Sequence, residues 1–198
     1  MKRSLALLSL LALAACVDTT GLSSESSKMP AGNPLAVVVV TEFADLECPA
    51  CRSANDLLKK PLLEKYATQI RYEYKHFPLR ALHRYAMDLA EAAECAADQG
   101  KFWEFVDAAF EHQDEVKQQG KEAIDAWGET LGLDTALFDR CRQSHIKKDA
   151  VNADYEEGRT AGVMGTPTFF VSGVQTEATI DALSAAIDAQ LQGATQRL

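Results

Sequence analysis

Two cysteines separated by two residues are the part of this sequence best suited to chemistry. Cys48 and Cys51 flank Pro49 and Ala50 in a Cys-Pro-Ala-Cys motif. Two sulfurs one helical turn apart can form a disulfide and exchange it with other thiols, so the spacing predicts redox chemistry. Half of a zinc site and a small structural staple are the alternatives. A zinc site would need a second close pair of Cys or His ligands, and none has that spacing.

The residues around the motif predict the elements that must position it. The β-branched run Val37–Thr41 precedes it and predicts a strand, and apolar residues at helical spacing follow it. Pro49 suits the first position of a helix, which places Cys48 at the helix N-terminus. Free backbone amides and the helix dipole favour an anion there. We therefore expect the pKa of the Cys48 thiol to be lowered.

The N-terminal residues have the pattern of an export signal. Met1-Lys2-Arg3 is followed by an apolar stretch too short to span a bilayer, so residues 1–15 are expected to be a signal peptide. Leu13-Ala14-Ala15-Cys16 resembles the lipobox of bacterial lipoproteins, which implies a lipidated Cys16 on the periplasmic side of a bacterial membrane. An ordinary signal peptide of a soluble periplasmic protein is the alternative.

The charge of the chain speaks against several classes of partner. Without residues 1–15, which contain Lys2 and Arg3, 18 Lys and Arg stand against 29 Asp and Glu, a formal net charge of −11. This acidity disfavours nucleic acid and a polybasic membrane patch. The sequence has no other long apolar run, so membrane attachment, if any, is expected through lipid only.

The remaining chain divides into segments of different pattern. Residues 16–34 lack periodicity and are expected to be a flexible tether. Strand patterns occur in residues 35–80 and again in residues 160–198. Residues 81–159 show helical patterns only and are expected to form a helical insertion.

Several motifs in order resemble the DsbA-like thiol-disulfide oxidoreductases. They are Glu42-Phe43 six residues ahead of the Cys-Pro-Ala-Cys motif, His76-Phe77-Pro78-Leu79, Gln99-Gly100-Lys101-Phe102-Trp103, and Gly165-Thr166-Pro167-Thr168-Phe169-Phe170. The resemblance covers about residues 35–195. It implies an α/β protein with the thioredoxin fold and an inserted all-helical subdomain. The thioredoxin-like domain would comprise residues 35–80 and 160–198, and the insertion would comprise residues 81–159.

The resemblance also implies roles for individual residues. Thr166-Pro167 would be a cis peptide bond against the cysteine pair, and Thr166, Pro49 and Ala50 would contact the substrate. Glu42 matches a buried acid that relays a proton to or from Cys51. The alternative is a carboxylate at the sheet edge that faces water.

Two departures from the family pattern affect the pKa of Cys48. Ala50 stands where the best-known oxidases carry a histidine, and Asp45 and Glu47 add negative charge if they lie close. We therefore expect the pKa of Cys48 to fall within roughly 3.5–7.5 without reaching the bottom of that range. His76 and His83 are expected to be structural histidines near the end of the second strand.

Cys95 and Cys141 remain after the other cysteines are assigned. An oxidising compartment favours a structural disulfide between them. Two buried free thiols, or a relay of resolving cysteines, are the alternatives.

These observations predict an exported enzyme that acts as a dithiol oxidase and introduces disulfides into exported proteins through Cys48 and Cys51. The substrates would be protein or peptide thiols, and no cofactor or metal is expected. The resemblance implies a quinone-linked membrane protein that reoxidises the pair, and the chain is expected to be a monomer. The alternatives are a disulfide reductase or isomerase, for which Thr166 would fit, and a non-catalytic metal-binding module.

Overall fold

The computed structural model describes residues 17–195. The expected signal peptide, residues 1–15, and the expected lipidation site, Cys16, lie outside the described residues.

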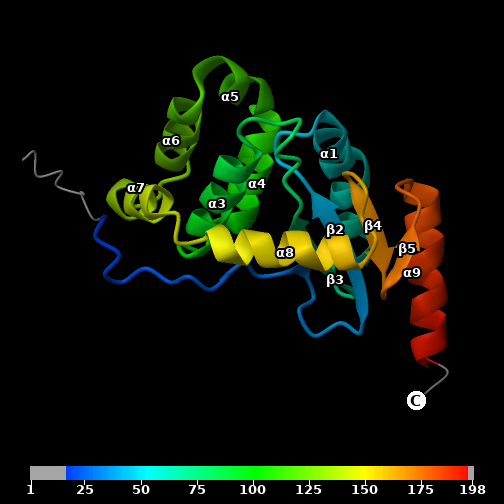
Figure 1. The fold of residues 1–198 in the computed structure, drawn as a ribbon. Helices are drawn as coiled ribbons and strands as arrows, with labels where there is room; N and C mark the ends of the chain where they lie inside the picture. Colours follow the sequence, from blue (N-terminus) through cyan, green and yellow to red (C-terminus); the bar gives the residue numbers. More distant parts are fainter. Residues whose placement is uncertain (1–16, 196–198) are drawn as a thin grey trace, which may run out of the picture.

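A five-stranded sheet forms the centre of the molecule, with strand order β1-β3-β2-β4-β5 (Figure 1). The central strand β2 is parallel to β3 and antiparallel to β4, as in the predicted thioredoxin fold. The strands are β1 (Ala31–Gly32), β2 (Val38–Ala44), β3 (Ile70–His76), β4 (Thr168–Val171) and β5 (Val174–Thr176). The mixed α/β fold class expected from the sequence is confirmed.

Helices cover both faces of the sheet because side chains alternate along β2. Val38 and Val40 pack with residues of the helices on one face, whereas Phe43 packs with Phe77 and Phe170 on the other. The first face carries α1 (Pro49–Ala54), the π-helical turn η1 (Asn55–Lys59), α2 (Lys60–Tyr66) and α9 (Ile180–Thr195). Helix α8 (Lys148–Thr160) covers the second face.

The close approach of α8 to the sheet depends on Gly158. A Cβ atom at this position would lie 2.8 Å from ring carbons of both Phe43 and Phe77. Helix α8 therefore belongs to the sheet layers, although its residues lie in the segment 81–159 that the sequence assigned to the insertion.

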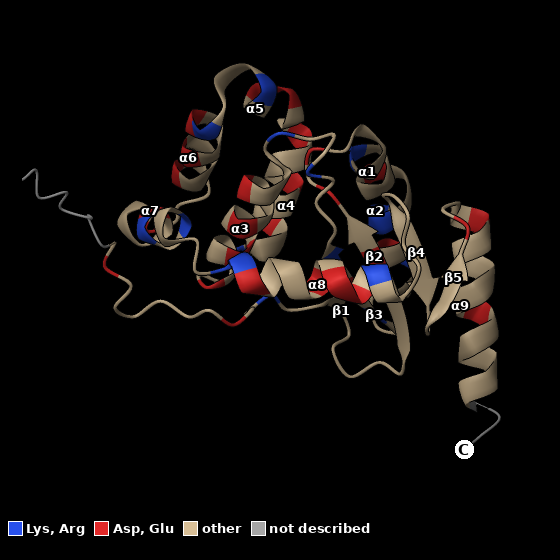
Figure 2. Ribbon diagram, viewed as in Figure 1, with Lys and Arg blue, Asp and Glu red and all other residues tan. Residues whose placement is uncertain are grey.

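The other helices of that segment form a separate lobe beside the sheet (Figure 1). They are α3 (Ala86–Ala97), α4 (Phe102–Glu111), α5 (Gln113–Gln119), α6 (Lys121–Thr130) and α7 (Thr135–Ser144). Their apolar faces share one core around Phe105, Val106 and Phe138. Acidic and basic residues are interspersed on the outer helices in the view of Figure 2.

The N-terminal segment, residues 17–34, differs from the flexible tether expected for residues 16–34. It runs along the molecule below α8 (Figure 1), and β1 within it pairs with β3. The indole N–H of Trp103 donates a 2.9 Å hydrogen bond to the carbonyl of Met29. The expectation of a free tether is therefore wrong for this part. The lack of periodicity in this segment could not reveal its contacts with Trp103 and β3, which lie elsewhere in the chain.

Candidate active site

The Cys48/Cys51 pair lies where the chain passes from the central strand into the first helix. Cys48 has extended backbone angles and occupies the N-cap of α1, and Pro49 begins the helix, as the sequence predicts. Both cysteines are free thiols, with exposed fractions of 7 % for Cys48 and 0 % for Cys51. Only Cys48 has an accessible edge, so an incoming sulfur reaches this residue first.

The environment lowers the pKa of Cys48 to about 5. Hydrogen bonding to the Cys51 thiol is the largest cause. It outweighs partial burial, and Thr166 and the backbone amides of Cys51 and Ala50 add to it. The value lies inside the range expected from the sequence. Cys48 is therefore a thiolate at neutral pH in the reduced protein and a good leaving group in disulfide exchange.

The pKa of Cys51 is shifted in the opposite direction. Burial raises the pKa of its thiol well above the ordinary value, and the neighbouring Cys48 sulfur and the Glu42 carboxyl raise it further. The backbone N–H of Asp45 donates to Cys51 Sγ at 3.5 Å. Cys51 therefore needs a proton acceptor before it can act as a nucleophile.

Glu42 lies near this thiol, since its charge contributes to the raised pKa of Cys51. It follows Val38 and Val40 at every second position of β2, so its side chain projects toward the helices α1 and α2. Only 2 % of the residue is exposed, which excludes a carboxylate that faces water. Burial raises the pKa of Glu42 to about 7, although a hydrogen bond from Tyr72 and the charge of Lys59 oppose the increase.

The peptide bond between Thr166 and Pro167 is cis and lies against the cysteine pair. Cys48 Sγ lies 3.5 Å from the Thr166 carbonyl oxygen, to which the protonated thiol donates. Pro167 and Ala50 share an apolar groove of about 400 Å³ with Leu57 and Leu58. The structure thus brings together Ala50, Thr166 and Pro167, which the family resemblance assigned to one site.

Asp45 and Glu47 are close to the cysteines but are engaged by backbone groups. Asp45 accepts hydrogen bonds from the amides of Glu47 and Leu79, and its carboxylate lies 2.8 Å from His83 Nδ1. Glu47 accepts a 2.6 Å hydrogen bond from the amide of Tyr85. The two carboxylates therefore fix the segment before α3 onto the active-site turn.

Gln113 is a site residue that the sequence analysis missed. It is buried at the start of α5, and its side-chain amide donates to the carbonyl oxygens of Leu46 and Cys48 at 2.8 and 3.1 Å. Through this side chain the insertion holds the active-site turn. Neither the spacing nor the type of Gln113 indicates a partner 65 residues away in the chain.

Lys59 was missed as well. It is 3 % exposed, and its ammonium lies 2.7 Å from Asp107 Oδ1 and 4.8 Å from the centroid of the Trp103 ring. Its charge lowers the pKa of Glu42, so it tunes the acid below the cysteines. A lysine in a predicted helix is expected to be exposed, so the sequence did not indicate that Lys59 is buried.

The second cysteine pair lies away from this site. Cys95 of α3 and Cys141 of α7 are joined by a disulfide with an S–S distance of 2.01 Å. The bond connects two helices of the insertion. It is separate from the free thiols of Cys48 and Cys51.

Comparison with known proteins gives one family and one fold. Residues 24–189 match a family model described as thioredoxin. BdbD from Bacillus subtilis superimposes with a TM-score of 0.76 at 17 % identity over 86 % of this chain and 98 % of that one. For α-DsbA1 from Wolbachia pipientis the TM-score is 0.72 at 20 % identity over 85 % and 92 %. These likenesses show a shared fold, and the resemblance to DsbA-like proteins expected from the sequence is confirmed.

A curated relative is much longer than the matched region. The Na(+)/H(+) antiporter NhaA 3 from Salinispora tropica is 40 % identical over 159 residues, which are 77 % of this chain and 23 % of the antiporter. The chain thus spans about a quarter of the length of the curated relatives it matches.

Proposed function

Because this chain belongs to the thioredoxin family and carries a Cys-Pro-Ala-Cys site with the fold of DsbA-like thiol-disulfide oxidoreductases, we propose that it is an exported dithiol oxidase. The observation that carries the proposal is that the pKa values of the two thiols are shifted in opposite directions. The pKa of Cys48 is lowered to about 5, whereas that of Cys51 is raised. A stabilised Cys48 thiolate favours the reduced pair, which makes the disulfide form an oxidant.

The proposed reaction begins with the Cys48–Cys51 disulfide. A substrate thiolate attacks Cys48 Sγ, the Cys48–Cys51 bond breaks, and Cys51 leaves and takes a proton that Glu42 supplies. A second substrate thiolate attacks the substrate sulfur of the mixed disulfide and releases Cys48 as a thiolate. The substrate loses two electrons and forms a disulfide, and the cysteine pair gains the two electrons.

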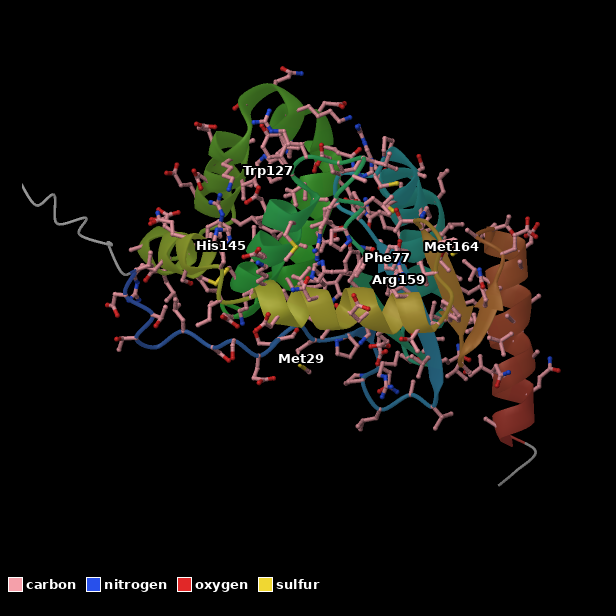
Figure 3. All side chains as sticks on the ribbon, in the orientation of Figure 1. Met29, Phe77, Trp127, His145, Arg159 and Met164 are labelled. Atoms are coloured by element: carbon pink, nitrogen blue, oxygen red, sulfur yellow. A yellow bond between two sulfur atoms is a disulfide. The ribbon has the colours of Figure 1, made fainter. Side chains whose placement is uncertain are left out.

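The groove beside the pair supports a peptide as the substrate. It is lined by Ala50, Ser53, Ala54, Leu57, Leu58, Pro167 and Ala178, most of which are apolar. Leu57 is 67 % exposed and Met164, near the cis peptide bond, is 94 % exposed (Figure 3). An unfolded or extended chain with apolar side chains suits this surface. Pro49 and Thr166 would contact the residues around the substrate cysteine.

The expected location and partners extend this proposal. We propose a signal peptide at residues 1–15, lipid on Cys16, and reoxidation of the pair by a quinone-linked membrane protein. Within residues 17–195, no helix has the length and apolar character needed to cross a bilayer. Attachment through lipid is the arrangement we propose for the exported chain.

The reduction potential tests the direction of electron flow. An oxidase is expected to have a Cys48/Cys51 potential above about −180 mV, whereas a value near or below that of thioredoxin, about −270 mV, would contradict the proposal. Such a low value would favour the reductase or isomerase alternative, in which reduced Cys48 attacks misformed disulfides.

A trapping experiment identifies the substrates. Cys51→Ala leaves Cys48 unable to release a mixed disulfide through its partner, so exported thiol proteins should accumulate as adducts. The matched control is Cys48→Ala, which should trap none because Cys51 is fully buried. Equal trapping by both variants would argue against Cys48 as the sulfur that forms the mixed disulfide with the substrate.

A further inference from the structure

His76, Glu94 and Asp154 form a buried cluster that the proposed disulfide exchange does not use. They come from β3, α3 and α8, and their exposed fractions are 1 %, 0 % and 6 %. One possible metal-ligand atom from each lies within 4.8 Å of those of the other two. We call these three residues the acid–histidine cluster.

A cation from the N-terminal segment already lies against this cluster. The ammonium of Lys28 is 2.7 Å from Glu94 Oε1 and 2.7 Å from Asp154 Oδ2. Lys75 is at the rim, with its ammonium 3.4 Å from Asp154 Oδ1. The carboxylates of the cluster therefore hold a positively charged group.

The ammonium leaves part of the cluster without a partner. Glu94 Oε2 is buried and has no hydrogen-bond partner among residues 17–195, whereas His76 Nε2 is in ion-pair contact with the other oxygen of Glu94. Nε2 lies 3.2 Å from Glu94 Oε1. A buried polar atom without a partner is costly. An ion that accepts lone pairs from imidazole nitrogen and from carboxylate oxygens would satisfy these atoms, and zinc-class ions bind these ligand types.

Neighbouring groups fix the orientation of the ligands. The backbone N–H of His76 donates to Asp154 Oδ2 at 3.0 Å, which holds this carboxylate beside the strand. The His76 ring packs edge to face against Tyr74 and Phe102, with centroid distances of 5.2 and 5.9 Å. Ligands held in this way lose little freedom when an ion binds.

The N-terminal segment lines a cavity beside the cluster. A cavity of about 230 Å³ beside Asp154 is walled by Ser26, Lys28, Met29 and Pro30 on one side. Its other side is formed by the body, including Tyr74 and Phe102. Met29 lies at the edge of the molecule below α8 (Figure 3). Displacement of residues 26–30 would open the cavity toward solvent.

We propose that the acid–histidine cluster is a binding site for one divalent zinc-class ion, with His76 Nε2 and one oxygen each of Glu94 and Asp154 as ligands. Lys28 competes with the ion for the same carboxylates. Binding of the ion displaces the Lys28 ammonium and releases residues 26–30 from the body. The site is distinct from Cys48 and Cys51.

The test uses oxidised protein, in which the Cys48–Cys51 disulfide cannot bind metal. Zn²⁺ is titrated by calorimetry into the wild type and into Lys28→Met, which removes the competing charge. Lys28→Met should bind one Zn²⁺ at least tenfold more tightly than the wild type. Lys75→Met is the matched control, because it removes a lysine from the same carboxylate but leaves Lys28 in place, and its affinity should change less than threefold.

Two further measurements identify the ligands. His76→Gln and Glu94→Gln, each combined with Lys28→Met, should weaken Zn²⁺ binding at least tenfold, with folding checked by circular dichroism. Co²⁺ bound to Lys28→Met should give visible d–d bands without a thiolate charge-transfer band. The spectrum identifies the type of ligand without substitution of a ligand residue.

Fluorescence reports the release of the segment. In a Trp127→Phe background, Trp103 is the remaining tryptophan, and its indole is bonded to Met29. Its emission should change on Zn²⁺ addition. Any one of the following results would overturn the proposal. Lys28→Met binds no stoichiometric Zn²⁺, or it binds Zn²⁺ with the same affinity as the wild type. Bound Co²⁺ gives a thiolate band, or Trp103 emission is unchanged when the site is saturated.

Discussion

The hydroxyl of Tyr72 donates a 2.6 Å hydrogen bond to Glu42 Oε2, while Glu42 Oε1 is buried without a hydrogen-bond partner in the described part of the chain. Tyr72 lies on β3 and Glu42 on the neighbouring strand β2. One carboxylate oxygen is thus held by the sheet, and the other is free to exchange a proton. This division suits an acid that serves a buried thiol and is itself kept in place.

Glu42 should control the pH dependence of the attack of Cys51 on a mixed disulfide, which is the reverse of the first step of the proposed reaction. We expect the rate at which Cys51 resolves a mixed disulfide to rise with an inflection near pH 7, and Glu42→Gln should remove this inflection. Tyr72→Phe should move the inflection to higher pH, because the lost hydrogen bond had favoured the carboxylate. Stopped-flow resolution of a model mixed disulfide measures both effects. An unchanged profile in Glu42→Gln would exclude Glu42 as the proton acceptor.

The same acid should make the oxidised protein less stable as the pH rises. The folded-state pKa of about 7 lies above the ordinary glutamate value of 4.5, so between these values the unfolded chain releases a proton that the folded chain keeps. The free energy of unfolding should therefore fall by roughly 2–3 kcal/mol between about pH 4.5 and pH 7. Denaturant titrations of wild type and Glu42→Gln measure it, and the variant should lack this decrease.

Reduced Cys48 should titrate near pH 5. Thiolate absorbance at 240 nm and the rate of alkylation should follow this value, while Cys51 stays unreactive. Cys51→Ala should raise the pKa of Cys48 by at least one pH unit, because the Cys51 thiol is the main stabiliser of the thiolate. Ser53→Ala is the control, since the Ser53 hydroxyl donates to the Pro49 carbonyl. Alkylation of Cys48 with a midpoint near pH 8.5 would contradict the proposed chemistry.

Gln113→Ala should destabilise the active-site turn. The substitution leaves the buried carbonyl of Leu46 without this donor and removes one donor from the Cys48 carbonyl, so we expect a loss of about 1–3 kcal/mol. Hydrogen exchange should increase at residues 46–48. Gln118→Ala on the exposed side of the same helix is the control and should have little effect. Equal stability of the two variants would show that the turn is held by other contacts.

The second disulfide should stabilise the insertion without affecting the redox site. The sequence separation of Cys95 and Cys141 is 46 residues, which corresponds to at most about 4 kcal/mol in the chain-entropy model. Cys95→Ala combined with Cys141→Ala should lower the free energy of unfolding by up to this amount. The pKa of Cys48 should stay the same, and a shift in that pKa would reveal coupling between the two sites.

The sequence by itself determined the main elements and the reactive pair. Val37–Thr41, Pro49 and the cysteine spacing are local features, and a strand, a helix start and a one-turn separation follow from local backbone preferences. The order of the motifs around Thr166-Pro167 was also enough to indicate the fold. Signals of this kind need no knowledge of distant partners.

Tertiary structure decided which side chains share a site. Gln113, Lys59 and Lys28 are polar residues whose types indicate exposure, and each is buried or docked against groups far away in the chain. The docking of residues 26–34 likewise depends on Trp103, β3 and the acid–histidine cluster. A buried charge is tolerated only where an oppositely charged group pairs with it. Groups that are far apart in the chain come together only when the chain folds.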